Sequence, residues 1–381
     1  MKTPLSWLQL SHEKSRLLIA LAGIGFADML MFIQLGFQAA LFDSSVTLHK
    51  AFTGDIFLMS PQSDALGFTE PFSQRRLYES LAVEQVESVV PIYLNFGTWK
   101  NPIERNTRTI LTIGFNPAQN PIDLPGIKEN IDRLKLPDAV LFDDRSRAEF
   151  GAIPDLLQQG TVTTEVSSHK VRVTGLFSLG ASFAADGNII TSDTNFLRLY
   201  DDRSLGLIDI GMINLKPGTN IVRAKANIKA KLPQDVEVFD KQEFIQEEIS
   251  YWQNATAIGF IFALGTGIGF IVGIVIVYQI LYTDVANHLP EYATLKAMGY
   301  KDRYFVMVVF QEAIILAVLG FVPGYFIAVG LYSLAAGATA LPLAMTVSRA
   351  TTVLILTIIM CSVSGSVAVK KLSAADPADI F

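Results

Sequence analysis

The sequence predicts an α-helical membrane protein with four transmembrane helices and a large mixed α/β domain inserted between the first and second of them. Three observations predict this fold class: long apolar runs, an uneven distribution of charge, and short β-rich stretches where most of the charge lies. About 20 apolar residues span the hydrocarbon core of a bilayer as a helix. The apolar runs are Leu17–Leu41, Ala257–Tyr282, Tyr304–Leu334 and Ala350–Val369.

Charged residues are few and concentrated in one part of the chain. They make up 17% of the sequence, against roughly 25% in ordinary globular proteins. Of the 36 Asp and Glu and the 30 Lys and Arg, 28 acids and 21 bases lie between Asp43 and Asn254. We therefore expect an aqueous domain there. Its excess of acids argues against nucleic-acid binding, which requires a basic face.

The nine remaining bases predict the orientation in the membrane. Eight of them precede the first span, lie between the second and third, or follow the fourth, and only Arg349 lies on the other side. Short loops rich in Lys and Arg stay cytoplasmic. We expect both termini in the cytoplasm and the large domain outside. The first run is longer than the 7–15 apolar residues of a signal peptide, so we expect a retained anchor.

The predicted segments follow one another in a simple order. They are an amphipathic interfacial helix (1–16), a first span (17–42), the aqueous domain (43–254) ending in a stalk helix (241–254), a second span (255–282), a cytoplasmic loop with a short helix (283–303), a third span (304–335), a short outer loop (336–348), a fourth span (349–369) and a cytoplasmic tail (370–381). A disordered basic leader is the alternative for the N-terminal segment. From Lys241 onward no Gly or Pro interrupts the pattern, which predicts one continuous helix from stalk to second span.

The aqueous domain alternates β-rich and helical patterns. Two stretches have apolar residues at helical spacing, Ser73–Leu81 and Val222–Leu232, and Pro233 ends the second. Short β-rich stretches are bounded by Gly, Pro, Asn or Asp. The predicted strands are Asp55–Met59, Val89–Phe96, Arg108–Phe115, Val171–Phe177, Asn188–Thr191, Ile210–Leu215 and Val236–Phe239.

We find no catalytic or metal-binding motif in the aqueous domain. His169 has no His or Cys partner at metal-ligand spacing. The adjacent carboxylates Asp143–Asp144 and Asp201–Asp202 are expected in loops, because consecutive side chains point to opposite faces of a strand. The G-x-x-x-x-G-K-[ST] motif does not occur. We expect a non-catalytic chain that binds no cofactor or metal, and any ATP hydrolysis to come from another subunit.

Glycines and two carboxylates mark the membrane spans. Gly265, Gly269 and Gly273 repeat every four residues, which favours close helix packing within the four-helix set or across a dimer. Tolerance of Gly in membrane helices is the alternative. Asp28, in the first span with Gln34, is expected to serve helix packing or a polar switch, with a protonated structural Asp or an ion pathway as alternatives. Glu312 is expected to be structural, snorkelling toward the basic loop or pairing with Gln311 or a loop base.

The loop between the second and third spans carries the most specific local pattern. Pro290 favours a helix start, and Gly299 is placed as a C-terminal cap. Tyr292, Leu295 and Met298 fall on adjacent faces of the helix between them. At 1.5 Å per residue Glu291–Met298 spans only ~12 Å, too short to cross a bilayer. It is expected to fit a groove on a cytosolic partner, and a connector between spans is the alternative.

This arrangement resembles a known family of permeases. The loop Glu-Tyr-Ala-Thr-Leu-Lys-Ala-Met-Gly-Tyr (Glu291–Tyr300) is similar to the corresponding loop of MacB/FtsX/LolC-type permeases of ABC transporters, and Ala375–Ala378 is similar to their Pro-containing tail. The layout matches over the whole chain. Phe26–Phe37 (FADMLMFIQLGF) resembles the first span of cyanobacterial DevC-type permeases.

The resemblance implies a homodimeric permease of the bacterial inner membrane with a periplasmic large domain. It implies docking of a separate DevA-like ATPase, which would bind ATP and Mg²⁺, on Glu291, Tyr292, Leu295, Lys296, Met298 and Gly299. It also implies a DevB-like membrane-fusion adaptor, a TolC-like outer-membrane duct, mechanotransmission, and a lipid, glycolipid or other amphiphilic substrate. The alternatives are an FtsX-like scaffold that relays ATPase motion to a periplasmic partner, and lipoprotein release as in LolC and LolE.

Overall fold

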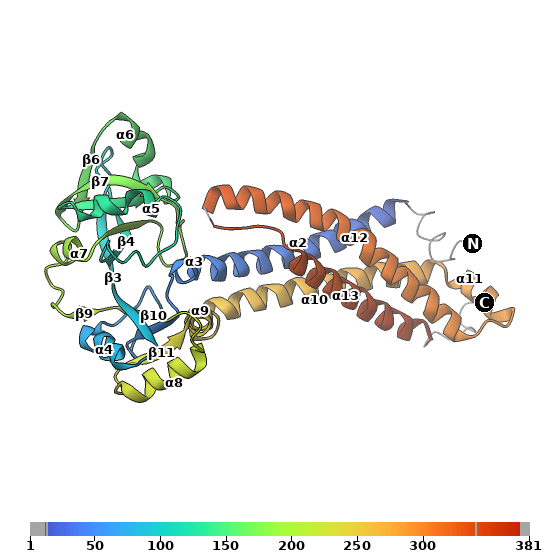
Figure 1. Ribbon diagram of the computed structural model, residues 1–381. Coiled ribbons are helices and arrows are strands. Elements are labelled where there is room, and N and C mark those ends of the chain that lie inside the picture. Colours follow the sequence, from blue (N-terminus) through green and yellow to red (C-terminus); the bar gives the residue numbers. More distant parts are fainter. Residues whose placement is uncertain (1–11, 13, 340, 374–381) are drawn as a thin grey trace. The chain divides into compact units, whose positions relative to one another are not determined.

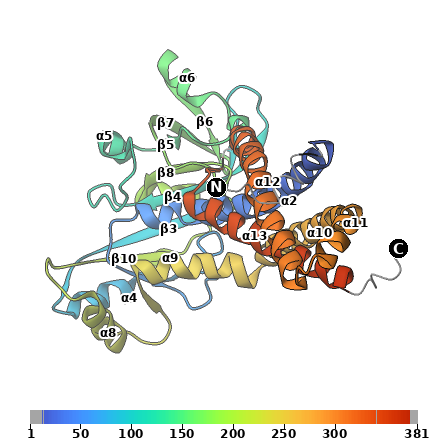
Figure 2. The ribbon, with the colours of Figure 1, turned by 90° about the vertical axis from the view of Figure 1, so that its right-hand side faces the viewer.

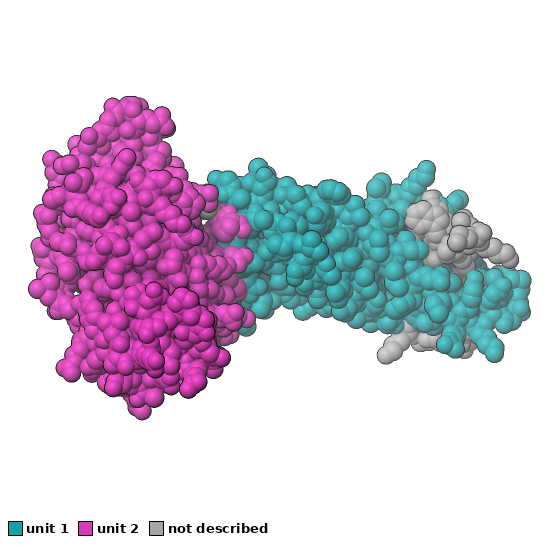
Figure 3. Space-filling model, in the orientation of Figure 1, with its two compact units in different colours: residues 1–40, 257–338, 343–381 teal, residues 41–256, 339–342 magenta. Residues whose placement is uncertain are grey.

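The computed structural model describes residues 12, 14–339 and 341–373 and divides the chain into two compact units (Figure 3). The membrane unit comprises Met1–Ala40, Ala257–Ala338 and Leu343–Phe381. The α/β unit comprises Leu41–Thr256 and Thr339–Pro342. The predicted interfacial helix lies mostly outside the described residues, as does the part of the tail after Ser373.

Within the described residues, four helices of the membrane unit are long and apolar enough to cross a bilayer. They lie side by side in two views (Figures 1 and 2). A short fifth helix, α11 (Leu289–Ala297), follows the second of them. The four long helices are α2 (Lys14–Ser45), α10 (Ala257–Asn287), α12 (Asp302–Thr339) and α13 (Val347–Ser373). With the α/β unit inserted between α2 and α10, they confirm the predicted fold class, a multi-pass membrane protein.

The α/β unit is built on a nine-stranded sheet with the strand order β11-β1-β10-β3-β4-β8-β5-β7-β6. The 15-residue strand β3 (Val86–Lys100) also pairs with β6 at Trp99 and Val166, so six strands close on themselves. The other strands are β1 (Ile56–Met59), β4 (Thr107–Phe115), β5 (Ala139–Asp143), β6 (Val162–Val166), β7 (His169–Phe177), β8 (Asn188–Ser192), β10 (Ile210–Leu215) and β11 (Glu237–Asp240), with β2 (Phe72–Ser73) and β9 (Leu207–Ile208) in a separate pair.

Short helices pack around this sheet. The α-helices are α3 (Thr47–Ala51), α4 (Gln74–Glu79), α5 (Ile127–Asn130), α6 (Ile153–Gln159), α7 (Asp193–Leu199), α8 (Ile221–Lys231) and α9 (Lys241–Ser250). Single 3₁₀ turns are η1 (Ser80–Ala82), η2 (Ile131–Lys135) and η3 (Ala148–Phe150), and η4 (Tyr251–Ala255) is a π turn. All seven predicted strands and both predicted helices are present. Strands β2, β5, β6 and β9 were not predicted: β5 is a short, wholly buried run, β6 contains two Thr and one Glu, and β2 and β9 have two residues each.

The stalk differs from the prediction. Helix α9 begins with a capping box formed by Asp240 and Glu243, then widens into η4 and stops at Thr256, whose backbone is extended (φ −109°, ψ 159°). The predicted continuous helix into the second span is therefore wrong. The Thr256 hydroxyl donates to the Trp252 carbonyl at 2.7 Å, and the Trp252 indole N–H donates to Glu248 at 2.7 Å. These side-chain bonds accompany the interruption, which no Gly or Pro signals.

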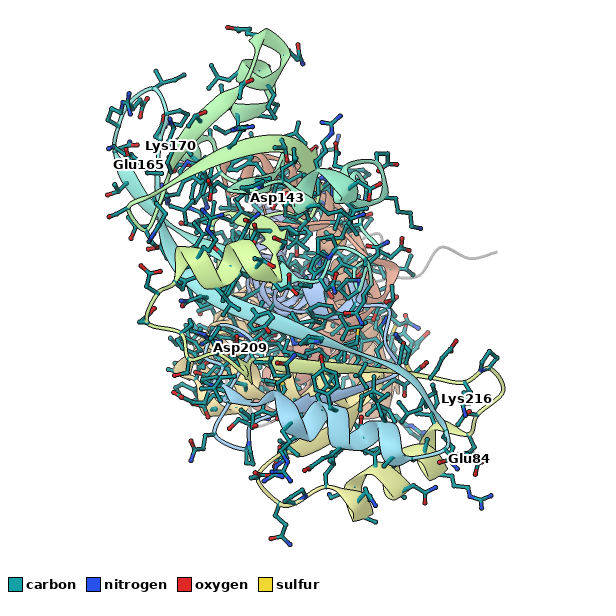
Figure 4. The ribbon with its side chains drawn as sticks, turned by 60° about the vertical axis from the view of Figure 1, so that its left-hand side comes forward. Glu84, Asp143, Glu165, Lys170, Asp209 and Lys216 are labelled. Atoms are coloured by element: carbon teal, nitrogen blue, oxygen red, sulfur yellow. The ribbon has the colours of Figure 1, made fainter. Side chains whose placement is uncertain are left out.

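Asp143 and Asp209 are buried in different parts of the α/β unit (Figure 4). Asp209 accepts hydrogen bonds from the Leu94 N–H at 2.8 Å and from Arg203 Nη2 at 2.5 Å. Among the described residues, no Lys or Arg side chain forms an ion pair with Asp143. Asp143 was expected in a loop, but it is the last residue of β5. Its two carboxylate oxygens accept four hydrogen bonds, which hold the turns that follow β5 and β7. The donors are Arg145 N–H, Leu179 N–H, Gly180 N–H and Asn188 Nδ2, at 3.1, 2.9, 2.9 and 2.8 Å. Burial is the largest influence on the pKa of Asp143 and raises it.

Replacing Asp143 by Asn should destabilise the α/β unit by about 1–3 kcal/mol, the cost of leaving buried polar groups unsatisfied. Each oxygen of Asp143 accepts two bonds, whereas an amide NH₂ in place of either oxygen would face two donors. Thermal unfolding of the full-length protein in nanodiscs measures the change. Asp144→Asn is the matched control, because that neighbouring carboxylate is exposed. Equal unfolding temperatures for the two variants would contradict this account.

Candidate functional site

Helix α11 has the predicted start and the predicted cap. Pro290 lies in its first turn, where a missing backbone N–H costs nothing. At the other end Gly299 adopts φ +95°, a conformation that favours glycine. Its N–H donates to the Lys296 carbonyl at 3.0 Å, and the Tyr300 N–H donates to the Leu295 carbonyl at 3.2 Å. These two bonds form a Schellman motif, which confirms the expected cap.

The two faces of α11 differ in their surroundings. Leu289 and Leu295 pack against a buried cluster of Val285, Phe305 and Val309 at the ends of α10 and α12. Of the residues predicted to couple to a partner, Leu295 thus faces the membrane helices. The structure does not describe the side chain of Tyr292. The other predicted coupling residues are exposed: Glu291, Lys296, Met298 and Gly299.

A buried pair of carboxyl groups lies close to α11 in the chain. Glu312 of α12 is 1% exposed and lies beside Asp284 of α10, and neither carboxylate oxygen of Glu312 has a hydrogen-bond partner among the described residues. His288 Nδ1 lies 3.7 Å from Asp284 Oδ2. The expectation that Glu312 snorkels or pairs with Gln311 or a loop base is therefore wrong. The sequence did not indicate that Glu312 and Asp284 lie close together, because residue spacing within one helix says nothing about a residue on another helix.

Asp28 lies in the interior of the membrane unit, as is usual for intramembrane carboxylates. Its Oδ1 accepts a hydrogen bond from the hydroxyl of Thr357 on α13 at 2.6 Å. The contact joins the first and last spans. This arrangement fits a role in helix packing, and a switching role for Asp28 stays a proposal.

The glycine stripe of α10 faces α2 and α13 of the same chain, which supports packing within the four-helix set. A Cβ added at Gly265 or Gly269 would contact Gln34 or Leu30 of α2, and one added at Gly273 would contact Met360 of α13 first and then Ala27 of α2. A second close approach, between α2 and α12, was not predicted. A Cβ at Gly324 would lie 2.8 Å from Asp28 Cβ and 3.0 Å from the Gly25 carbonyl. Gly320 and Gly324 have the same four-residue spacing, which was the available signal.

One small cavity of the α/β unit, of about 30 Å³, is lined in part by Ser44, Gly67, Ser182 and Glu248. This volume suits one or two water molecules rather than a substrate. Within the described residues no group of three or more His, Cys, Asp or Glu side chains is arranged to hold a metal ion.

Comparison with protein families identifies part of the chain. Residues 263–377, from α10 through α13 into the tail, match the family described as FtsX-like permease C-terminal. No curated protein matches this sequence.

Three solved structures resemble the chain at low identity. The periplasmic region of MacB from Actinobacillus actinomycetemcomitans is 12% identical, with a TM-score of 0.37 over 51% of this chain and 92% of that one. The extracellular domain of the noncanonic ABC-type transporter YknZ from Gram-positive bacteria is 13% identical (TM-score 0.34, 48% and 98% covered). A domain of a putative permease protein from Porphyromonas gingivalis is 14% identical (TM-score 0.30, 50% and 89% covered).

Replacing Gly324 by Ala should lower the thermal stability of the membrane unit. The added methyl group would press on Asp28 Cβ and on the Gly25 backbone, which has little room to move. Gly330→Ala on the same helix is the matched control, because nothing lies within 4 Å of its Cβ position. It should keep or raise stability, since Ala favours a helix by up to about 1 kcal/mol over Gly. Thermal unfolding in nanodiscs compares the two; a Gly324→Ala protein as stable as the control would exclude this close approach.

Proposed function

We propose that this protein is the permease subunit of an ABC-type exporter, in which a separate ATPase on the α11 side drives movement of the α/β unit. One observation carries the proposal. A short helix with an exposed face is held against two membrane helices inside the segment that matches the FtsX-like permease family, residues 263–377. The family match supports a permease role, and the geometry of α11 supports the place of coupling.

The exposed face of α11 suits a protein partner. Glu291 and Lys296 offer charges of opposite sign, and Met298, 65% exposed, offers a flexible apolar side chain next to them. Met is enriched in protein–protein interfaces and adapts to irregular grooves. The nine residues of α11 span ~13 Å, enough to fit one groove. We propose that the partner is a DevA-like ATPase that binds ATP and Mg²⁺ itself.

The inner face of α11 provides a route for mechanical coupling. Leu289 and Leu295 pack on side chains of both α10 and α12, so a push on α11 acts on both helices. Along the chain α10 leads back through Thr256 and η4 to α9, whose cap Asp240 is the last residue of β11. One non-helical residue, Thr256, separates the membrane helix from this segment. In this proposal Thr256 is the hinge of the mechanotransmission path.

We propose a homodimer with α10 at or near its interface. Only 17% of the most apolar window of α10 is buried in the chain, against 39–44% in the other three spans. Its exposed side chains are large and apolar, among them Phe260, Ile268, Ile271 and Val275. A membrane helix with so few partners in its own chain has the most surface left for a second copy.

The finer assignments rest on the resemblance of Phe26–Phe37 to DevC-type permeases. We propose an inner-membrane location with cytoplasmic termini and a periplasmic α/β unit. A DevB-like adaptor and a TolC-like duct would complete the exporter. The substrate would be a lipid, a glycolipid or another amphiphile that enters from the outer leaflet or the periplasm.

Two other functions use the same layout. An FtsX-like scaffold would pass ATPase motion to a periplasmic partner without transport, and a LolC/LolE-like protein would release lipoproteins. The family match to an FtsX-like domain is compatible with both. A deletion strain distinguishes them: accumulation of glycolipid in the inner membrane supports the exporter, accumulation of lipoprotein supports release, and neither supports the scaffold.

The double variant Lys296→Glu/Met298→Asp should no longer stimulate ATP hydrolysis by the proposed ATPase partner when both proteins are reconstituted in nanodiscs. Both side chains are exposed on α11, so the change alters docking and leaves the packing of Leu295 intact. ATP hydrolysis with the wild type and the variant measures the effect. Leu205→Asp/Lys229→Glu, a matched pair of changes at exposed residues of the α/β unit, should stimulate as the wild type does.

Two results would count against docking on α11. One is full stimulation by the α11 variant, which would place the contact elsewhere. The other is equal loss with the control pair, which would indicate a general effect of added negative charge.

A further inference from the structure

Four aromatic side chains gather where the α/β unit adjoins α10 in the chain. Phe183 lies 5.1 Å from Trp252 between ring centroids, Phe68 lies 6.1 Å from Tyr251 and 6.4 Å from Trp252, and Tyr251 lies 5.2 Å from Trp252. We call these four residues the aromatic edge. Trp252 is buried beneath the others, whereas Phe68 and Phe183 are 56% and 49% exposed. The edge therefore presents two large apolar rings that no described residue fully covers.

Hydrogen bonds close the turns that carry the two exposed rings. Phe68 closes a turn through its N–H, which donates to the Ala65 carbonyl at 2.8 Å. The Leu66 N–H in that turn donates to buried Glu248 at 2.7 Å. The turn that carries Phe183 is closed by the Ser182 N–H, which donates to the Ala185 carbonyl at 2.8 Å. The exposure of both rings is thus part of the local structure.

Chain connectivity brings the aromatic edge close to the bilayer. Ala257, where α10 begins, follows Trp252 by five positions, so the two lie at most ~18 Å apart. The first turns of α10 are apolar, and Phe260 and Ile261 are 68% and 57% exposed, as expected for residues in hydrocarbon. Trp and Tyr concentrate at the membrane–water interface, where an apolar ring and a polar group are both satisfied. Trp252 and Tyr251 lie a few residues before the start of the membrane-spanning helix α10, where such interfacial residues are expected.

We propose that the aromatic edge inserts Phe68 and Phe183 into the headgroup region of the leaflet next to the α/β unit, with phospholipid as the partner. The fold brings two loop residues, far from the spans in sequence, beside the two interfacial aromatics that precede α10. The surface then rests on lipid and anchors the base of the α/β unit at the bilayer. This contact requires only the four membrane spans and does not depend on transport.

Spin-label depth measurements test the proposal. The sequence contains one cysteine, Cys361, which is buried, so a Cys361→Ala background allows single labels at Phe68→Cys or Phe183→Cys. Leu205→Cys, at a residue 84% exposed in the same unit, is the control. In phosphatidylcholine/phosphatidylglycerol nanodiscs, the ratio of accessibility to oxygen over accessibility to a water-soluble nickel chelate should be several-fold higher at 68 and 183 than at 205.

Either of two results would overturn the proposal. A ratio at 68 and 183 equal to that at 205 would place the edge in water. Labels shielded from both reagents would mean that a second copy or another protein region covers it. Because labelling removes a ring, Phe183→Trp and Leu205→Trp provide a second measurement: bromine-labelled lipids should quench the added fluorescence at 183 and leave that at 205 unchanged. Absence of quenching at 183 would also overturn the proposal.

Discussion

The carboxylate of Glu248 joins the segments through which the chain enters and leaves the α/β unit. It is 3% exposed and accepts hydrogen bonds from the Leu66 N–H and the Trp252 indole, both at 2.7 Å, while His49 Nε2 lies 3.4 Å away. A buried carboxylate is stable only with such partners. Because α3, the turn at Leu66 and η4 converge on one side chain, the segment before the first strand and the segment after the last strand are held together, and the start of β1 pairs with the end of β11.

In the membrane unit Asp28 follows the same rule, since it accepts a hydrogen bond from Thr357 of another helix. Glu312 lies beside Asp284 of another helix, and its oxygens have no hydrogen-bond partner among the described residues. Glycines provide the close approach that lets such short side chains meet, most directly at Gly324 beside Asp28. Polar contacts and small residues therefore act together, since apolar side chains alone gain little by leaving lipid for another helix.

Local pattern explains which parts of the structure could be predicted. The cap at Gly299 and the strands with clear boundaries were predicted because each depends on residues adjacent in sequence. Strand β5 and the environment of Asp143 were not, since a buried run has no alternation and its hydrogen-bond donors come from residues up to 45 positions away. The interruption at Thr256 was missed for a similar reason: side-chain bonds from Thr256 and Trp252 accompany it, and no Gly or Pro marks it.

The sequence by itself determined the four spans, the inserted α/β domain and the short helix between the second and third spans, because apolar run length, charge distribution and turn residues act locally. Only the tertiary structure decided which faces meet: that Leu295 faces the membrane helices while Met298 is exposed, that Glu312 contacts Asp284, and that Phe68 and Phe183 join Trp252. Such contacts depend on the relative placement of elements far apart in the chain, and periodicity in a single segment does not encode that placement.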